Sequence, residues 1–393
     1  MKRVSSILAI ILSLVVAVES RGQRQADNDD IITVDVRKSS YPKRELILQD
    51  FMDVEYIPLE TNDEFVNQGF VLDIGKKFIL VRNFIQDGNI FVYNRAGKAV
   101  RRINHKGPTS KEYTNMLWVI LDEDNDEIFV SDLYTGRILV YNLHGKFKRS
   151  FNQNPNSREF YKYFNYICNY DKEHLICNDQ NSNEIAFFII SKQDGSITKE
   201  IKIPFKKKEL LRQTIREGST GRSVSPASCR TMTSDNDNWM LTEFSSDTIY
   251  TFLKDYSLCP FIVRTPPVQS MDPKVFLNLN LVTNRYYFME TIKNVYDFNT
   301  NTGFPSTSFM YDRQEKNFFE YTVYNDDYST TKREVSMKYL KQGYYENQLW
   351  RSIDAFRLVE DYEKGILKGK LKEIASKLDE EDNPVIMLVK QKK

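Results

Sequence analysis

The sequence has little glycine, little histidine and almost no net charge, and each shortage excludes a class of protein. The 15 glycines among 393 residues are about 4%, against an average of about 7%, which excludes collagen-like chains and glycine-rich linkers. Lys and Arg number 55 and Asp and Glu 54, so there is no overall basic field and no nucleic-acid partner is expected. The three histidines lack zinc-ligand spacing, and nucleotide-binding and nucleophile-elbow motifs are absent. The sequence therefore assigns no catalytic residue.

Long apolar runs are missing as well, except for one at the N-terminus. A basic flank precedes a 12-residue apolar run, Ile7 to Val18, which is interrupted only by Ser13. A run of this length after basic residues is typical of a secretory signal and is short for a membrane span. We expect cleavage after Ser20, with Gly22 as the second choice and an uncleaved anchor as the alternative.

The predicted signal peptide, residues 1–20, would be followed by a flexible stretch, 21–30, and by a single domain over 31–393. No later run approaches the roughly 18 apolar residues that a membrane-spanning helix needs, so we expect no transmembrane segment in the mature chain. No cysteine follows the apolar run, which leaves no lipobox for a lipid anchor. The prediction is a periplasmic or secreted protein.

The chain has only four cysteines: Cys168, Cys177, Cys229 and Cys259. In an exported protein they could form disulfides. A hairpin centred between Lys172 and Glu173 would place Cys168 directly opposite Cys177, where cross-strand side chains come close enough for a bridge. Buried free thiols are the alternative, and the sequence leaves both open.

Aromatic residues are abundant at 13%, and they fall within an internal repeat. Ile90–Lys98 resembles Ile138–Lys146 at an offset of 48 residues, and Phe78–Asn83 matches Glu127–Asp132 upstream. Each unit reads as short strands separated by polar turns, with Asx residues forming turns that glycine often forms. Looser copies extend the repeat to five units over about 70–324.

The strands of these units are near-continuous apolar and aromatic runs. A sheet with one face in water would alternate apolar and polar residues, so continuous runs indicate sheets that are covered on both faces. Four-stranded sheets packed around an axis satisfy this requirement, and closure of the ring removes free edges. We therefore predict an all-β fold, a six-bladed β-propeller, in which Phe and Tyr rings fill the space between blades.

A sixth blade can be assembled from both ends of the sequence. Four strands are predicted outside the repeat: 32–36, 54–59, 348–353 and 384–389. Pairing an N-terminal strand with the last blade would close the ring. Apolar residues at helical spacing from Leu358 to Leu378 predict one C-terminal amphipathic helix on the rim, and a shorter helix is predicted from Lys208 to Arg216.

Several segments carry a family resemblance. The second unit, from Val119 to Gly145, resembles a propeller repeat of the NHL or TolB-like type. Four further landmarks are Asp50–Thr61, Asp73–Lys77, Ser246–Tyr250 and Asp382–Val385. Through them, residues 30–393 resemble the exported six-bladed β-propeller proteins of Bacteroides and related bacteria. Many members carry a lipobox cysteine, which this chain lacks, and the resemblance supplies no settled activity and no catalytic residues.

Five polar residues end the second strands of their units at equivalent positions: Asn83, Asp132, Asp179, Glu243 and Glu290. In a propeller they would form a ring near one face, where carboxylate oxygens could hold Ca²⁺ or another divalent cation. The alternative is that each side chain accepts backbone N–H bonds and fixes the loop to the next strand. No cofactor is expected apart from such a metal. The acidic run Asp122–Glu127 departs from an EF-hand loop and is predicted to be a hairpin turn.

The polar loop between the first two units, from His105 to Tyr113, is a candidate ligand site because loops between blades border the axial funnel. Lys111, Glu112 and Tyr113 are its candidate ligand-binding residues, and an ordered connector without a ligand is the alternative.

The expected function is non-enzymatic recognition of a protein, peptide or glycan in the cell envelope, through a propeller face or the axial funnel. The alternative is a divalent-cation-dependent hydrolase or lyase with carboxylates around the axis. A scaffold without a small ligand is the third hypothesis.

Overall fold

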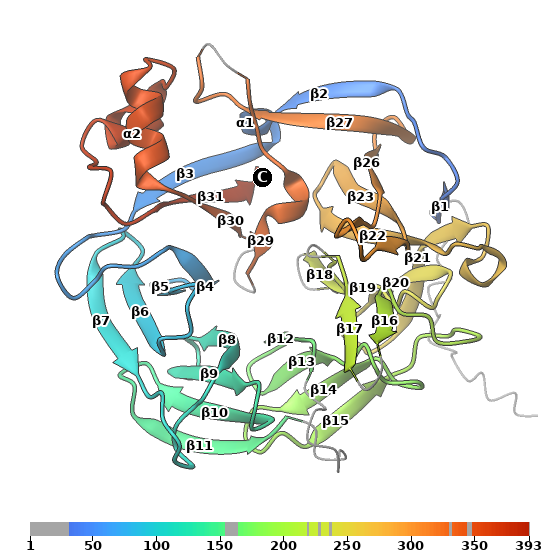
Figure 1. Ribbon diagram of the computed structural model, residues 1–393, viewed down its shortest axis with the longest axis horizontal. Coiled ribbons are helices and arrows are strands. Elements are labelled where there is room, and N and C mark those ends of the chain that lie inside the picture. Colours follow the sequence, from blue (N-terminus) through green and yellow to red (C-terminus); the bar gives the residue numbers. More distant parts are fainter. Residues whose placement is uncertain are drawn as a thin grey trace, which may run out of the picture.

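The computed structural model describes residues 31–153, 164–217, 220–226, 229–235, 238–329, 332–343 and 348–392. Within them, six principal β-sheets stand around a common axis and form a six-bladed β-propeller (Figure 1). The predicted all-β class and the predicted number of blades are therefore confirmed. The predicted signal peptide, 1–20, and the stretch 21–30 lie outside the described residues.

Blades 1, 2 and 3 are antiparallel four-stranded sheets whose strands follow one another along the chain. Blade 1 contains β4 (Phe70–Ile74), β5 (Phe78–Arg82), β6 (Asn89–Asn94) and β7 (Ala99–Asn104). Blade 2 contains β8 (Met116–Asp122), β9 (Glu127–Asp132), β10 (Arg137–Asn142) and β11 (Phe147–Asn152). Blade 3 contains β12 (Tyr166–Asn169), β13 (His174–Asn178), β14 (Phe187–Ser191) and β15 (Ile197–Ile201). These are the first three units of the predicted repeat.

Blades 4 and 5 each gain an outer parallel strand from the N-terminal segment. Blade 4 contains β18 (Met232–Asp235), β19 (Asn238–Leu241), β20 (Thr248–Phe252) and β21 (Leu258–Thr265), with β1 (Ile32–Asp35) beside β21. Blade 5 contains β22 (Val275–Val282), β23 (Tyr286–Lys293), β26 (Ser306–Asp312) and β27 (Asn317–Asn325), with β2 (Lys43–Ile47) and β28 (Arg333–Glu334) beside β27. The sequence offered the strands at 32–36 and 54–59 for the sixth blade, and the structure places the first of them in blade 4.

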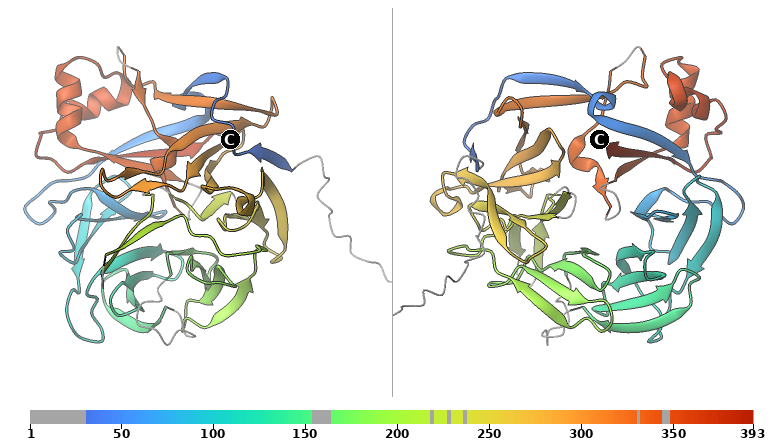
Figure 2. Two further views of the ribbon diagram at one scale, coloured as in Figure 1. Left: turned by 45° about the vertical axis from the view of Figure 1, so that its right-hand side comes forward. Right: turned by 180° about the vertical axis from the view of Figure 1, so that it is seen from behind.

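Blade 6 closes the ring with strands from both ends of the chain, as predicted. It contains β29 (Lys341–Gln342), β30 (Leu349–Ile353), β31 (Val385–Gln391) and β3 (Met52–Pro58). Strand β3 pairs with β31 along its whole length, in a register that runs from Met52 opposite Gln391 to Pro58 opposite Val385. A short helix, α1 (Leu48–Phe51), joins β2 to β3. Figure 2 shows the closed ring from behind.

Two helix predictions need correction. The C-terminal helix is two helices, α2 (Ala355–Glu363) and α3 (Gly369–Ala375), because Gly365 adopts a φ of +68° between them and ends the first. The short helix predicted from Lys208 to Arg216 is absent, since residues 213–217 form strand β16 (Gln213–Glu217), which pairs with β17 (Thr220–Val224). A β-branched pair in the middle of that segment, Thr214 and Ile215, favours a strand over a helix.

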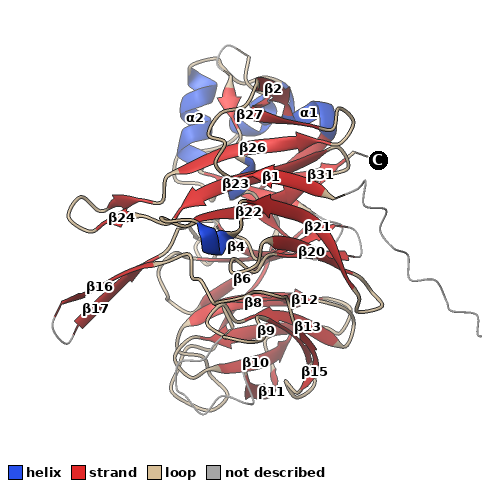
Figure 3. Ribbon diagram, turned by 90° about the vertical axis from the view of Figure 1, so that its right-hand side faces the viewer, coloured by secondary structure: helices blue, strands red, loops and turns tan. Residues whose placement is uncertain are grey.

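The β16–β17 hairpin projects from the ring next to a second small hairpin, β24 (Tyr296–Asp297) and β25 (Thr302–Gly303), as Figure 3 shows. The Gln213 side-chain amide donates a hydrogen bond of 2.6 Å to the Asn294 carbonyl and ties the two hairpins together. Two single 3₁₀ turns, η2 (Val268–Ser270) and η3 (Met337–Tyr339), lie in the connections after β21 and before β29.

Strand β5 shows why the apolar runs are continuous. Ile79 and Val81 pack with Trp350 of blade 6, whereas Leu80 between them packs with Val119 of blade 2. Ile79, Leu80 and Val81 are all fully buried. Because successive side chains point to opposite faces, a strand between two neighbouring blades needs apolar residues at every position.

Candidate functional site

The structure has a cavity of about 580 Å³ between blades 6 and 1, here called the seam cavity. Its wall comes from the start of β4 with the segment before it, from Phe84, from β29 and β30, and from the segment 334–339. The volume lies within the range of about 300–1,000 Å³ that is typical of small-molecule sites. The cavity lies where distant parts of the sequence close the ring, so no single repeat unit encodes it.

Four aromatic side chains line the seam cavity: Phe70, Phe84, Tyr339 and Trp350. Phe84 and Tyr339 are 63% and 57% exposed, so two large rings face solvent instead of the core. Phe70 meets Phe84 edge to face, with ring centroids 5.5 Å apart. Trp350 is buried, and a Cβ at Gly343 would lie only 2.7 Å from its ring, so glycine there permits the close approach.

Two cations, Lys341 and Arg351, line the same cavity. The Lys341 Nζ lies 3.5 Å from the centroid of the Phe70 ring, and the Arg82 guanidinium carbon lies 4.2 Å from the same centroid. Cations are attracted to aromatic faces in this way. The Lys341 ammonium also donates a hydrogen bond of 3.2 Å to the Val71 carbonyl. The two cations have different charged neighbours: the Arg82 guanidinium lies near Lys341, whereas the Asp354 carboxylate is among the charges that act on Arg351.

The charge on Lys341 is costly at this position. Lys341 is an exposed residue, but loss of solvent around its ammonium, together with the nearby Arg82 charge, lowers the pKa of Lys341 to about 8. Burial also lowers the pKa of Arg351. One acidic residue, Glu334, lines the cavity and is exposed. The lining thus combines aromatic rings, hydroxyl groups and cations, which suits ligand binding.

A buried polar network holds the seam together beside the cavity. The Asn383 amide donates to the carbonyls of Glu60 at 2.8 Å and Phe65 at 2.6 Å, and its Oδ1 accepts the Asn67 N–H at 2.8 Å. The Asn67 amide in turn donates to the Tyr93 hydroxyl at 2.6 Å. This network joins the last turn of blade 6 to blade 1 and explains the Asp382–Val385 landmark of the sequence.

The same network leads directly into the cavity wall. Gly69 follows Asn67, has a φ of +68°, and packs so closely on Pro384 that a Cβ would lie 2.6 Å from the proline ring. Its carbonyl accepts a hydrogen bond from the Ser352 hydroxyl. Phe70 is therefore positioned by a backbone turn that only glycine readily adopts.

In the predicted ligand loop, Lys111 to Tyr113, two of the three side chains make contacts within the protein. Tyr113 is fully buried, and its hydroxyl donates to the Gly88 carbonyl at 2.6 Å. The Glu112 carboxylate accepts the Thr109 N–H at 2.9 Å. Only Lys111 is exposed. The alternative stated for this loop, an ordered connector, fits these contacts, because two of the three side chains are used within the loop and its blade.

Two members of the predicted metal ring cap loops. Asp132 accepts the N–H groups of Thr114 at 2.8 Å and Tyr134 at 3.1 Å. Asp179 accepts the N–H of Asn181 at 2.9 Å. These are the backbone bonds that the capping alternative requires.

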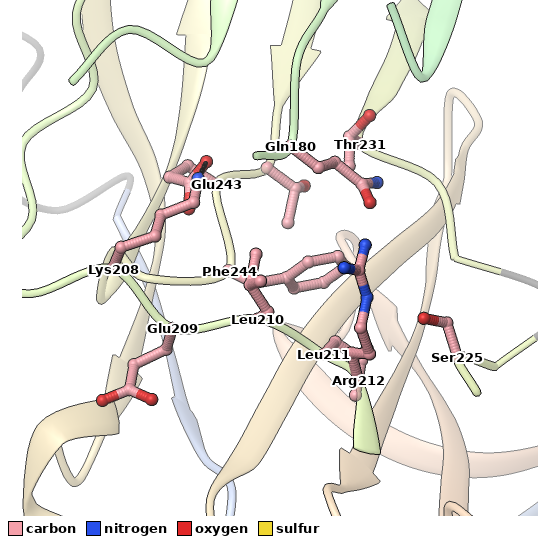
Figure 4. Close-up of a pocket in the computed structure, with 11 residues that line it drawn as sticks. Gln180, Lys208, Glu209, Leu210, Leu211, Arg212, Ser225, Thr231, Glu243 and Phe244 are labelled. Carbon is pink, nitrogen blue, oxygen red and sulfur yellow. Dashed lines mark hydrogen bonds and ion pairs between the residues drawn. The ribbon is translucent and has the colours of Figure 1, made fainter. Parts of the chain in front are cut away.

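A third member, Glu243, forms an ion pair. Its carboxylate contacts the Lys208 ammonium at 2.9 Å and accepts the Ser245 N–H at 3.0 Å. Figure 4 shows this pair on one side of a small pocket beside Arg212 and Phe244. The Glu243 charge is thus balanced within its own blade and the loop that precedes it.

The last two members also have partners close by. Asn83 accepts the Gln68 N–H at 3.0 Å, and Glu290 lies 3.5 Å from the Lys338 ammonium. Among the described residues no group of three or more His, Cys, Asp or Glu side chains is arranged to hold a metal ion. The contacts of Asn83, Asp132 and Asp179 are those that the capping alternative requires, and the shared metal site remains a prediction.

The register predicted for the cysteine hairpin is wrong by one residue. Strand β12 pairs with β13 so that Cys168 faces Ile176 and Cys177 faces Ile167. The two thiols consequently point to opposite faces of blade 3, and all four cysteines are free. Burial raises the pKa of the Cys168 thiol to about 12, which keeps it protonated and unreactive.

The acidic run after β8 forms the predicted hairpin turn. The Asp122 carboxylate forms an ion pair of 2.7 Å with the Lys192 ammonium of blade 3. Asp126 adopts a positive φ of 55° in the turn. The run therefore joins neighbouring blades.

None of the residues that line the seam cavity was predicted from the sequence as a site residue. One signal was present, since Phe84 and Ile85 follow β5 as an apolar pair in a polar loop and are 63% and 66% exposed. An apolar pair outside a strand is a sign of a surface with a binding role. Lys341 and Arg351 carried no such signal.

The closed ring of sheets defines the chain as a six-bladed β-propeller. The chain belongs to the family described as Domain of unknown function (DUF4934), whose model matches residues 31–390. No curated protein matches the sequence. Among the described residues, no helix is both long and apolar enough to cross a membrane.

Solved structures that resemble this chain are distant in sequence. One is described as a "Putative exported protein" from Bacteroides fragilis, with 15% identity, a TM-score of 0.57, and coverage of 89% of this chain and 99% of that one. A member of the DUF4221 family from Bacteroides vulgatus has 10% identity, a TM-score of 0.46, and coverage of 88% and 99%. A streptogramin B lyase has 10% identity, a TM-score of 0.33, and coverage of 88% and 99%.

Proposed function

We propose that the protein is an exported, non-enzymatic recognition protein that binds its ligand in the seam cavity. The observation that carries this proposal is a cavity of about 580 Å³ in which two aromatic rings, Phe84 and Tyr339, are left largely exposed. Exposed rings beside cations, on a wall of rigid strands, are typical of a preformed binding site. The ligand would be a component of the cell envelope, such as a glycan or the end of a peptide or protein.

Export is supported by the N-terminal pattern of a basic flank and a 12-residue apolar run. The description of the Bacteroides fragilis protein with the same fold is consistent with it. A metal-dependent lyase or hydrolase gains no support, because the candidate carboxylates are engaged in caps and ion pairs.

The test is a binding screen in which the cavity variant has a matched control. Soluble envelope glycans and short peptides would be screened by thermal shift, and hits measured by calorimetry, with the wild type and a Phe84→Ala/Tyr339→Ala double variant. Tyr134→Ala is the control, because Tyr134 is 63% exposed but lies on blade 2. We expect the double variant to weaken binding by about tenfold or more and the control to leave it unchanged. A ligand that binds all three proteins equally would place recognition elsewhere.

A further inference from the structure

The seam cavity presents two open aromatic rings. The Phe70 ring is already contacted by cations, since the Lys341 ammonium and the Arg82 guanidinium lie 3.5 Å and 4.2 Å from its centroid. Phe84 and Tyr339 line the cavity beside it and remain exposed. These two rings are therefore the apolar surfaces that a ligand in the cavity can cover.

The backbone holds the Phe84 ring in its exposed position. The Phe84 N–H donates to the Gln68 side-chain carbonyl at 2.9 Å, and the Gln68 N–H donates to the Asn83 side chain at 3.0 Å. The Arg82 guanidinium donates to the Asn83 carbonyl at 2.7 Å and to the Phe84 carbonyl at 3.4 Å. Because these bonds fix the loop in advance, little conformational entropy is lost when a ligand packs on the ring.

Tyr339 is presented by a fixed turn in the same way. The chain buries Met337 and Leu340 on either side of it, and the Tyr339 N–H donates to the Ser336 carbonyl at 3.2 Å. The Lys338 ammonium lies 5.1 Å from the Tyr339 centroid, yet the ring stays exposed. Both open rings thus belong to backbone that the fold has already ordered.

The charged side chains on the aromatic side of the cavity have opposite signs. Lys341 and Glu334 both line the cavity and are exposed. Trp350 pairs with Lys341 and packs on blade 1, so Arg351, the next residue of β30, directs its side chain to the opposite face of blade 6. A charged ligand would meet a like charge in this lining, whereas a neutral ligand with hydroxyl groups can donate to the carboxylate and accept from the ammonium.

We propose, resting on the binding function above, that the seam cavity recognises a neutral sugar unit of a glycan. The C–H face of the sugar packs on Phe84 and Tyr339, because aromatic faces are negative and attract the weakly positive C–H groups. The sugar hydroxyls bond Glu334 and Lys341. An apolar ring without hydroxyl groups would cover the same aromatic surfaces but would leave these polar groups without partners.

The experiment uses the purified protein with neutral disaccharides and one neutral peptide probe. Maltose, cellobiose, lactose and diacetylchitobiose are compared by saturation-transfer NMR, and the affinities of those that bind are measured by calorimetry. The uronic-acid and amino-sugar analogues of the best disaccharide supply negative and positive forms of the same ring. Acetylphenylalanine amide is the peptide probe, because it carries an aromatic ring but no sugar.

The variants remove the aromatic faces while keeping apolar side chains. Phe84→Leu and Tyr339→Leu are the cavity variants. Tyr134→Leu is the matched control, because Tyr134 is as exposed as Phe84, at 63%, but lies on blade 2, outside the cavity. Circular dichroism checks that each variant is folded.

We expect at least one neutral disaccharide to bind with a Kd of about 1 mM or below, with saturation concentrated on the C–H protons of one sugar face. Phe84→Leu and Tyr339→Leu should each weaken this binding by about fivefold or more, while Tyr134→Leu leaves it unchanged. Neither charged analogue should bind more tightly than the neutral sugar.

The inference is overturned if no neutral disaccharide binds, if both cavity variants bind as tightly as the wild type, or if a charged analogue binds more tightly. If the peptide probe binds and depends on Phe84 and Tyr339 while no sugar does, the proposed function survives and the sugar assignment fails. If sugar and peptide binding are both unaffected by the cavity variants, recognition lies elsewhere and both proposals fail.

Discussion

Two lysines at blade junctions have opposite surroundings. Lys192, between blades 2 and 3, is 5% exposed and contacts the Asp122 carboxylate at 2.7 Å and the Asp171 carbonyl at 2.7 Å. Lys341, between blades 6 and 1, donates to one carbonyl and lies over the Phe70 ring, with no carboxylate beside it among the described residues. The first lysine is buried and completes a structural contact, whereas the second is exposed beside a cavity.

This difference separates two kinds of junction in one ring. Where polar groups satisfy each other, as at Lys192 or in the Asn383 network, the chain uses them to hold blades together. At the seam cavity, by contrast, the cations and the rings of Phe84 and Tyr339 remain exposed. Buried and satisfied polar contacts therefore indicate a structural role, whereas large rings left exposed beside a cavity indicate a candidate site.

The largest expected effect comes from Lys192→Met. This change leaves the Asp122 carboxylate, 2% exposed, without its ion-pair partner. Loss of one member of a buried pair costs about 3–5 kcal/mol of unfolding free energy, because the remaining charge is uncompensated. Urea denaturation measures the change, and Lys172→Met, an exposed lysine in the neighbouring turn, is the control. A loss below about 1 kcal/mol would show that the junction relies on apolar packing and would weaken the distinction.

The next effect is expected for Asn383→Ala in the seam network. Two buried backbone groups, the Phe65 carbonyl and the Asn67 N–H, and one half-buried group, the Glu60 carbonyl, lose their partner. We expect a loss of about 3 kcal/mol, since each unsatisfied buried group costs about 1–3 kcal/mol. Thermal unfolding tests this, with the exposed Asn299→Ala expected to change little. A variant as stable as the control would mean that water replaces the amide.

The fold could be predicted from the sequence because five units repeat the same pattern of strands and turns. The continuous apolar runs of β5, β9 and β14 and the strands at both ends indicated the ring and its closure. The errors were local. The register of the Cys168 hairpin differs by one residue from the predicted one, and a one-residue slip reverses the face of every side chain. Gly365 divided the helix because a single glycine with positive φ outweighs helical periodicity.

The candidate site could not be predicted in this way. The residues sought as ligands, Asp132 and Tyr113 among them, are repeated or loop residues that the fold uses for caps and packing. The seam cavity instead combines Phe70 with Lys341 and Trp350, more than 250 residues away in the sequence. Contacts of that kind depend on how the ring closes, and no local pattern encodes them.

A smaller effect is expected for the stability of Lys341→Met, in contrast to Lys192→Met. The folded-state pKa of Lys341, about 8, lies below that of an unfolded lysine, about 10.4, so the unfolded chain binds more protons between these values. The contribution of Lys341 should therefore make the wild type more stable as the pH rises from about 8 to about 10. Below about pH 8 the lysine is protonated in both states, and its destabilising effect is at its largest. Because the side chain is open to solvent, we expect Lys341→Met to gain no more than about 1 kcal/mol at neutral pH. Denaturation at about pH 7 and about pH 9 measures the difference in unfolding free energy between the variant and the wild type, which should become smaller at the higher pH. A clear loss of stability in the variant would instead make Lys341 a structural residue like Lys192.

The smallest expected effect concerns divalent cations. A cation bound only by the folded ring would raise the melting temperature, by an amount equivalent to about 2.7 kcal/mol at a hundredfold excess over Kd. The described carboxylates are instead committed to loop caps and to lysines, as Asp132 and Glu243 show, and these contacts are already complete without an ion. We therefore expect Ca²⁺ and a chelator to give melting temperatures within about 1 °C of each other. If Ca²⁺ raises the melting temperature by several degrees and Asp132→Asn removes this rise, the carboxylates would again be candidates for a metal site. A residue such as Asp132 would then be both a loop cap and a cation ligand.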